Sequence, residues 1–326
     1  MAKQLKIRTE GAVQVIEFYN PPHNYITHIM LRELYTHLLK ARSDDSVRVL
    51  VLTGGLEDAF LTHYDVADLL EYRRATATTR SVRATHRLAY ILAWLSSRLD
   101  RWAWLDHMAI GRISRRTRGE QSIYYWMRCI HILDSFPKPL IAAVNGIALG
   151  GGCEMTLCCD FRYMADDERY RIGLPEILLG ITPGGTGTPL RLPRIVGEAK
   201  ALEMLLTGRI YRPSEAEAMG LIHQHVSAVQ LMPTVMALAQ KLSRGAPLAQ
   251  AAVRAAVRQG SRVTWPQGRV LELAGAIRAM NSEDADRGMS AYVADIAPQF
   301  EGVDLEKRLA LYGELYDGRL TDFKSD

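Results

Sequence analysis

Short apolar runs alternate along the chain with segments whose apolar residues recur at helical spacing. Several of the runs are about half a dozen residues long, and two end directly in glycine-containing turns. Runs of this length and ending are typical of buried strands. The sequence predicts strands at Val47–Leu52, Leu140–Val144 and Phe161–Ala165, and helices at Ile29–Ala41, Cys153–Cys158 and Ala199–Leu206. Such alternation favours an α/β core.

The pattern changes in the last third of the chain. Pro213-Ser214-Glu215-Ala216 is a helix-opening sequence, and that helix is expected to stop at Gly220. From about Leu231 the periodicity is almost wholly helical. We therefore expect a core over residues 1–230 and a helical region over residues 231–326.

The composition is that of an ordinary globular protein of 326 residues, with 48% hydrophobic and 23% charged side chains. The N-terminus has no apolar signal core, and no stretch approaches the roughly 18 uncharged apolar residues of a membrane span. The cysteines form neither a zinc-type pair nor a spaced disulfide framework. We expect a cytoplasmic protein with buried, reduced thiols at Cys129, Cys153, Cys158 and Cys159.

Residues 71–120 differ from the rest of the chain. They contain eleven arginines, no lysine and four acids, a net charge of +7, whereas the whole chain carries +4. Three tryptophans lie among the arginines, and apolar residues recur at helical spacing. Part of this basic segment is expected to be an amphipathic helix that presents Leu88, Ile91, Leu92, Leu95, Leu99 and Trp102.

Three interpretations of the basic segment are open. The simplest is a helical hairpin packed on the protein, with a solvated arginine face. A second is a lid or phosphate-contacting surface for an anionic substrate. A third is contact with an anionic membrane surface or with RNA. The sequence contains no recognised RNA-binding module, so a nucleic-acid partner is not expected, while membrane contact stays open.

Candidate chemistry lies between residues 150 and 189. Three glycines, Gly150–Gly152, stand where a helix should begin, and Glu154 falls on its first turn among apolar neighbours. Glu176 follows Pro175 further along the chain. Either acid could simply complement a helix dipole. However, a helix N-terminus beside two acids also suits polarisation of a carbonyl with proton transfer next to it.

The motifs around these residues resemble the crotonase (enoyl-CoA hydratase/isomerase) superfamily. The resemblance rests on K-P-L-I-A-A-V-N-G at Lys138–Gly146, the glycine run with Glu154, and A-M-G-L-I-H-Q-H-V at Ala218–Val226. N-P-P-H-N from Asn20 and V-R-V-L-V-L-T-G-G from Val47 match more weakly. The family implies an α/β spiral of ββα repeats with a helical C-terminal oligomerisation region, assembled as a homotrimer or homohexamer. Compared with the usual spacing in this family, the basic segment is an insertion.

The resemblance implies a role for each candidate residue. Glu154 would activate water, and Glu176 would exchange a proton with the α-carbon of an enoyl thioester. The backbone N–H groups of Tyr64 and Gly151 would form the oxyanion hole for the thioester oxygen. The substrate-binding residues would be Thr62, His63, Tyr64, Asp65 and Gly150. Asp65 also fits a helix cap.

The chain departs from the family pattern at the oxyanion loop. Thr62-His63-Tyr64 replaces the usual Ala-Gly-Ala, so His63 would have to adopt a conformation that glycine takes easily. The imidazole of His63 and the phenol of Tyr64 would either shape the pocket or add an acid/base group. Glu57-Asp58 stands where the family has a basic residue for the CoA phosphates. The carrier is therefore open between coenzyme A and an acyl-carrier protein.

Two further differences lie near the acids. The spacing between Glu154 and Glu176 is longer than in the family, and the extra residues fall within Ala165–Arg171, where a surface turn is expected. The loop Pro183–Pro189 resembles the family's glycine-rich turn with one extra residue, and it is interpreted as a tight connection. It is not a phosphate-binding Walker loop.

The sequence thus predicts an enzyme: an enoyl-CoA hydratase-like lyase that adds water across the 2,3 double bond of an enoyl thioester. No metal or permanently bound cofactor is expected, and coenzyme A enters as part of the acyl-CoA substrate. Within enzymes the alternatives are an isomerase, a decarboxylase or a thioester hydrolase of the same fold. The alternative from another class is a hydratase-like binding protein that acts through its Arg/Trp-rich insertion.

Overall fold

The computed structural model describes residues 3–77, 116–183, 185–300, 302–316 and 320–324. Most of the basic segment, including the helix expected from Leu88 to Trp102, lies outside the described residues. The described ends of that segment belong to two helices that pack on each other, α2 (Val66–Ala77) and α5 (Arg118–Asp134).

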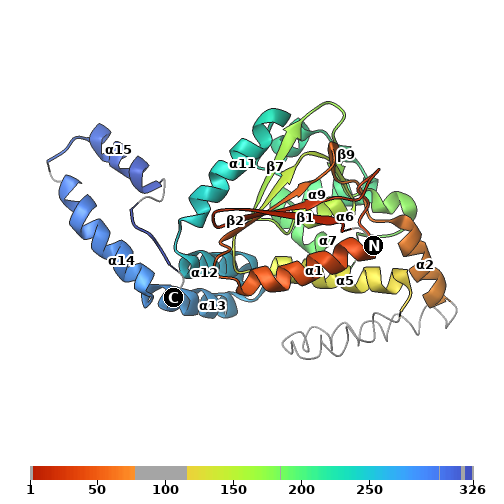
Figure 1. The fold of residues 1–326 in the computed structure, drawn as a ribbon, viewed down its shortest axis with the longest axis horizontal. Helices are drawn as coiled ribbons and strands as arrows, with labels where there is room; N and C mark the ends of the chain where they lie inside the picture. The colour runs from red at the N-terminus through yellow and green to blue at the C-terminus, as the bar shows by residue number, and fades with distance from the viewer. Residues whose placement is uncertain (1–2, 78–115, 184, 301, 317–319, 325–326) are drawn as a thin grey trace.

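Two sheets form the centre of the fold (Figure 1). The larger sheet has the strand order β1-β2-β3-β5-β7-β10, and the smaller one has the order β4-β6-β8-β9. Only the β1–β2 and β8–β9 pairings are antiparallel in the described sheets. The strands are β1 (Leu5–Glu10), β2 (Val13–Phe18), β3 (Val49–Gly54), β4 (Asp58–Leu61), β5 (Leu140–Val144), β6 (Gly146–Leu149), β7 (Phe161–Asp166), β8 (Ile172–Gly173), β9 (Ile210–Tyr211) and β10 (Gln224–Ser227).

The three predicted strands are confirmed as β3, β5 and β7. Every residue of β5 and all but Gly54 of β3 are buried, which is why these strands are apolar along their whole length. β3 begins two residues later than expected because the preceding N–H groups are used elsewhere. Val47 N–H donates to the carbonyl of Asp44, and Arg48 N–H donates to that of Ala12.

The predicted helices are confirmed with small shifts of their ends. The α-helices besides α2 and α5 are α1 (His28–Ser43), α6 (Gly151–Thr156), α7 (Thr188–Arg191), α8 (Pro193–Val196), α9 (Glu198–Thr207), α10 (Pro213–Ala218), α11 (Ala228–Ser243), α12 (Pro247–Arg258), α13 (Trp265–Met280), α14 (Glu283–Ala291) and α15 (Leu305–Tyr316). Short 3₁₀ or π turns are η1 (Pro175–Leu179), η2 (Gly260–Arg262), η3 (Tyr292–Ile296) and η4 (Ala297–Phe300). α6 starts earlier than expected because its chain turns at Gly150, where φ is 52°.

The helices are arranged in layers around the larger sheet. α11 packs on β3, β5 and β7, whereas α1 and α5 lie side by side along another side of the core (Figure 1). α12 and α13 pack on each other near these helices, and α14 and α15 form an arm that extends away from the sheets (Figure 1). None of the helices in the described part of the chain is both long and apolar enough to cross a membrane.

All four cysteines are buried and unpaired, as predicted. Burial raises the pKa of each thiol above its ordinary value. Their packing in the interior makes them structural side chains.

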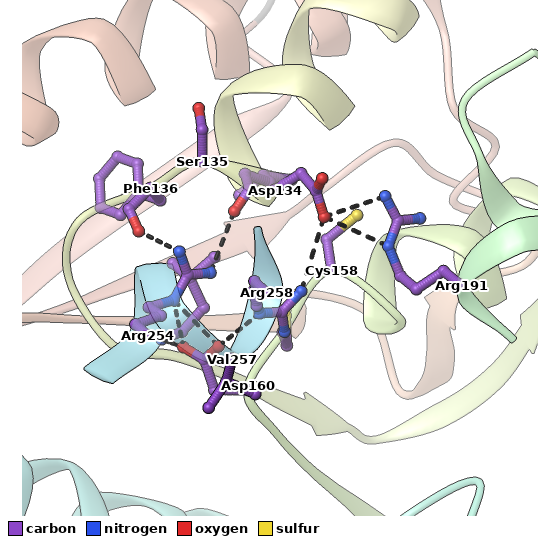
Figure 2. A network of polar contacts seen from close by, with 12 residues as sticks. Asp134, Ser135, Phe136, Cys158, Asp160, Arg191, Arg254, Val257 and Arg258 are labelled. Carbon is purple, nitrogen blue, oxygen red and sulfur yellow. Dashed lines mark hydrogen bonds and ion pairs between the residues drawn. The ribbon is translucent and has the colours of Figure 1, made fainter. Parts of the chain in front are cut away.

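Two acidic residues tie the C-terminal helices to the core (Figure 2). Asp160 accepts hydrogen bonds from Nε of Arg254 at 2.8 Å and Nε of Arg258 at 2.9 Å, both on α12. Asp134, the last residue of α5, accepts from Arg191 at 3.1 Å and pairs closely with Arg262 of η2. Burial raises the pKa of Asp134, but the hydrogen bonds and charges of Arg262 and Arg191 outweigh it and lower that pKa to about 2.

We predict that Asp134→Asn lowers the free energy of unfolding by about 2–4 kcal/mol at pH 7, because it leaves its arginine partners uncompensated. The folded-state pKa of Asp134, about 2, lies below its ordinary value. The stabilisation is therefore present above about pH 4 and is lost as the pH falls towards 2. Urea unfolding at pH 7 and pH 3 measures both effects.

The matched control is Asp167→Asn, since Asp167 pairs with the exposed side chain of Arg169. It should leave the urea midpoint at pH 7 unchanged. Equal midpoints for wild type and Asp134→Asn would show that the Asp134 cluster does not stabilise the fold.

Candidate active site

Three neighbouring parallel strands end at the candidate site. β4, β6 and β8 pair in that order within the smaller sheet. Tyr64 follows β4, the segment Gly150–Glu154 follows β6, and Glu176 follows β8. Parallel strands present their carboxyl ends at one edge of a sheet, so residues that are distant in sequence meet there.

Two glycines allow close approach to β4, Gly152 at this edge and Gly146 at the opposite, amino ends of β4 and β6. A Cβ on Gly152 would lie 2.0 Å from the carbonyl oxygen of Leu61, and one on Gly146 would lie 2.0 Å from the carbonyl carbon of Asp58. Neither position tolerates a larger residue without movement of the main chain. Leu149 N–H also donates to the carbonyl of Thr62 at 3.0 Å, which holds the Tyr64 loop against the start of α6.

The two N–H groups expected to form the oxyanion hole both lack an acceptor among the described residues. Gly151 is the first residue of α6, so its N–H has no partner within the helix. Ile26 pairs with the residues on either side of Tyr64: its N–H donates to His63, and its carbonyl accepts from Asp65, both at 3.0 Å. The N–H of Tyr64 therefore faces away from Ile26.

The Tyr64 side chain points to α5. Its hydroxyl donates to Oγ of Ser122 at 2.6 Å, and its ring meets Trp126 edge-on with centroids 5.7 Å apart. Burial raises the pKa of the phenol above its ordinary value. Of the two roles left open by the sequence, this position favours pocket shaping over acid/base chemistry.

His63 does not adopt the glycine-like conformation expected from the sequence. In the described chain, the non-glycine residues with positive φ are Asn24 and Asp58, so that expectation is wrong. His63 has a negative φ, and its carbonyl accepts the hydrogen bond from Ile26. Its ring stacks on Tyr25 with centroids 4.3 Å apart, and its Nδ1–H donates to the carbonyl of Tyr64 at 2.7 Å.

The other polar residues of this loop make local contacts. Oδ1 of Asp65 accepts from the N–H of Ala67 at 2.9 Å at the start of α2, which confirms the predicted cap. The hydroxyl of Thr62 donates to the carbonyl of His23. These contacts fix the loop on both sides of the Tyr64 N–H, and a direct substrate contact by either side chain stays a prediction.

Glu154 is held by two threonines that sequence reasoning did not identify. Its side chain is buried, with only 4% of the residue exposed. Its Oε2 accepts hydrogen bonds from the hydroxyls of Thr186 at 2.8 Å and Thr188 at 2.6 Å. The loop read as a tight connection therefore also positions Glu154. Hydrogen bonds of this kind favour the charged form of a carboxylate.

Glu176 has the opposite environment. A Cβ on Gly150 would lie 2.9 Å from its Oε1, which places the carboxyl beside the glycine run. Its Oε2 is buried and has no hydrogen-bond partner among the described residues. Burial, together with the charge of Glu154, raises the pKa of Glu176 to about 7. A carboxyl group with such a pKa can keep its proton near neutral pH and serve as a general acid.

Asp58, which stands where the family has a basic residue for the CoA phosphates, has its own charge partner. Asp58 pairs with Arg169, at 3.0 Å, and accepts a hydrogen bond from the hydroxyl of Tyr170. Both partners lie in the segment of extra length between the two acids, which forms the predicted turn between β7 and β8. The longer turn thus offsets the negative charge of Asp58, one of the two acidic residues at Glu57-Asp58.

The fold is of the crotonase type. The sequence model for the enoyl-CoA hydratase/isomerase family matches residues 8–92 and 115–303, and the chain belongs to this family. The match omits residues 93–114, which lie inside the basic segment.

Curated relatives and solved structures agree with this assignment. A probable enoyl-CoA hydratase of Rhizobium meliloti (strain 1021) is 30% identical over 298 residues, which cover 91% of this chain and 97% of that protein. The 2,3-dehydroadipyl-CoA hydratase of Escherichia coli (strain K12) is 40% identical over 170 residues, 52% of this chain and 66% of that one. A crystal structure of enoyl-CoA hydratase from Bacillus anthracis superposes with a TM-score of 0.69 and 26% identity, covering 89% of this chain and 96% of that one.

We predict that Glu176→Gln stabilises the protein at high pH only. The folded-state pKa of Glu176, about 7, lies above its ordinary value, so wild-type stability falls as the pH rises from about 4.5 through 7. Glutamine cannot ionise, so the variant should exceed wild type by roughly 1–3 kcal/mol at pH 8.5 and match it near pH 4.5.

Urea unfolding at the two pH values measures this difference. Glu203→Gln is the control, because Lys200 and Arg209 lower the pKa of Glu203 and its removal should bring no gain at pH 8.5. A gain for Glu176→Gln of equal size at both pH values would mean that ionisation of Glu176 is not its cause.

Proposed function

We propose that this protein is an enoyl-CoA hydratase, a lyase that adds water across the 2,3 double bond of an enoyl thioester. The observation that carries the proposal is the asymmetric acid pair. Glu154 receives two hydrogen bonds that favour its charged form, while desolvation and the charge of Glu154 raise the pKa of Glu176 to about 7. Hydration needs one base and one acid at neighbouring carbons, and this pair supplies both.

The reaction follows from the placement of these groups. The thioester oxygen accepts hydrogen bonds from the N–H groups of Tyr64 and Gly151, which draws electron density away from the β-carbon. Glu154 takes a proton from water as the water oxygen bonds to that carbon. The electron pair of the double bond then takes the proton of Glu176 at the α-carbon. Each backbone donor is expected to lower the barrier by about 3 kcal/mol.

The acyl group and its carrier belong to the proposal as well. Relatives named for hydration of enoyl-CoA and 2,3-dehydroadipyl-CoA support coenzyme A as the carrier. The pairing of Asp58 with Arg169 offsets a charge that would repel the phosphates of coenzyme A. Phosphate contacts by the basic segment, and its contact with an anionic membrane, lie outside the described residues.

A homotrimer or homohexamer is the proposed assembly. Large apolar side chains are exposed on the C-terminal helices, among them Trp265 at 80% and Leu305 at 72% of their accessible area. Apolar surface of this kind is typical of faces that bind another protein. Light scattering of the purified protein tests the assembly. The cytoplasmic location stays a prediction.

The alternatives differ from hydration in their products. An isomerase, decarboxylase or thioester hydrolase of this fold would use the same oxyanion donors with a different use of the acids. Loss of the conjugated thioester absorbance together with formation of a 3-hydroxyacyl product identifies hydration. A binding protein acting through the basic segment would instead show salt-dependent binding to RNA or anionic vesicles that deletion of residues 78–115 abolishes.

We predict that Glu154→Gln and Glu176→Gln each lower kcat for crotonyl-CoA hydration by about 10²–10⁴-fold, because each removes a group that transfers a proton. In wild type, kcat/KM should be bell-shaped in pH and should fall above about pH 7 as Glu176 loses its proton.

The dehydration of 3-hydroxybutyryl-CoA should follow the same pH profile. Hydration moves a proton from Glu176 to Glu154 without changing the number that the pair holds, so both directions require the singly protonated pair. Profiles that differ between the two directions, or full activity of either glutamine variant, would contradict this use of the acids.

We also predict that Thr188→Val lowers kcat and moves the acidic limb of the pH profile upward by about one unit. The variant keeps the shape of the side chain but removes the 2.6 Å hydrogen bond that favours the charged form of Glu154. Thr188→Ser restores the hydroxyl and should restore the profile. A loss of activity with an unshifted acidic limb would assign Thr188 a purely structural role.

A further inference from the structure

The side chain of Tyr64 attaches the proposed oxyanion loop to α5. Its hydroxyl donates to Oγ of Ser122 at 2.6 Å, and its ring meets Trp126, one helical turn further along α5, edge-on. The exposed fractions are 8% for Tyr64, 0% for Ser122 and 3% for Trp126. Because closely packed interiors leave side chains little room to move, one face of α5 holds both the ring and the hydroxyl of Tyr64.

Ser122 also forms a hydrogen bond to α2. The serine oxygen that accepts from Tyr64 still has its own hydrogen to donate. The acceptor is Asp68 of α2: burial raises the pKa of Asp68, and the hydrogen bond from Ser122 acts in the opposite direction. Since an ionised carboxylate only accepts, the hydrogen bonds run from Tyr64 through Ser122 to Asp68. Residues of three separate elements thus share one short buried chain.

The two helices that carry these partners are in direct main-chain contact. A Cβ on Gly119 of α5 would lie 2.5 Å from the carbonyl oxygen of Asp68 and 2.6 Å from the nitrogen of Tyr72, both in α2. Gly119 lies about one turn before Ser122. α5 also packs along α1. Ser122 is therefore held in place from two sides and gives the Tyr64 hydroxyl a fixed acceptor.

This attachment acts on the N–H group that is expected to face the thioester oxygen. The N–H of Tyr64 and the carbonyl of His63 belong to one planar peptide group and point in opposite directions. The carbonyl accepts from Ile26 at 3.0 Å, which holds one end of the plane. The plane could still rotate about that hydrogen bond. The contacts of the Tyr64 side chain with α5 restrict this rotation and so fix the direction of the N–H.

We propose that Ser122 is a positioning residue, which orients the N–H of Tyr64 towards the thioester oxygen by holding the Tyr64 phenol. The donor is a main-chain group and exists with any side chain at this position, so Ser122 contributes only its direction. The alanine of the usual family pattern would have neither the ring nor the hydroxyl for this contact. The inference rests on the proposed hydration, because the N–H acts on the thioester oxygen of that reaction.

The first test is Ser122→Ala with crotonyl-CoA as the substrate. The variant leaves the Tyr64 hydroxyl without its acceptor, so the N–H loses its fixed direction. We expect kcat to fall about three- to tenfold, the contribution of one hydrogen bond, while KM stays within about twofold of wild type. The two constants separate because an oxyanion donor acts mainly on charge that develops in the transition state.

A spectroscopic readout distinguishes positioning from a loss of structure. Hexa-2,4-dienoyl-CoA has a conjugated thioester whose absorption moves to longer wavelength when hydrogen-bond donors polarise its carbonyl. At saturating ligand, Ser122→Ala should show a smaller shift than wild type. A variant that is merely less stable would contain less folded protein, but each bound ligand would keep the wild-type shift.

Tyr64→Phe removes the same hydrogen bond from the other side and keeps the ring against Trp126, so it also serves if Ser122→Ala does not fold. It should lower kcat and the shift as much as Ser122→Ala, and the double variant should lose no more than either single one. Ser135→Ala is the matched control, because it removes a serine hydroxyl at the other end of α5, where Ser135 donates to the carbonyl of His131 at 3.0 Å. Its kcat and shift should equal those of wild type.

Three results would overturn the inference: wild-type kcat in either folded single variant, a lower kcat with an unchanged shift, or a double variant that loses the product of the two single effects. If wild type does not hydrate crotonyl-CoA, the proposed function fails instead. The shift of bound hexa-2,4-dienoyl-CoA then still tests whether Ser122 orients the N–H, because it requires binding and no turnover.

Discussion

The site depends on one close contact between main-chain segments. The carbonyl of Leu61 at the end of β4 lies where a Cβ of residue 152 would be, so only glycine allows α6 to begin against that strand. This contact, with the hydrogen bond from Leu149 to Thr62, brings the N–H groups of Tyr64 and Gly151 to one edge of the smaller sheet. Side chains in the same loop can then vary, as His63 and Tyr64 do, without loss of either backbone donor.

The two glutamates are chemically alike, and their surroundings make them different. Glu154 meets two hydroxyl donors, whereas Glu176 has a buried oxygen without a donor among the described residues and feels the charge of its neighbour. Arg191 connects this arrangement to the C-terminal region, since it contacts both Asp134 and the carbonyl of Thr186. The docking of α12 and η2 on the core is thus linked to the loop that holds Glu154.

The sequence predicted what depends on local pattern. Apolar runs located β3, β5 and β7, and the glycines with Glu154 and Glu176 located the candidate site. It did not predict contacts set by tertiary structure. The hydroxyls of Thr186 and Thr188 lie in a loop whose glycines and prolines signal only a turn, and Asp134 meets arginines that are distant in the chain. His63 was misjudged because its pairing with Ile26 has no local signal.

The interior position of all four cysteines has a practical consequence for work on this enzyme. A thiol reacts with electrophiles as its thiolate, and burial disfavours that form at every one of these positions. Chromogenic disulfide reagents that trap free coenzyme A should therefore meet little competition from the native polypeptide. Thioester cleavage can then be followed continuously in the unmodified enzyme, without first replacing its sulfhydryl groups.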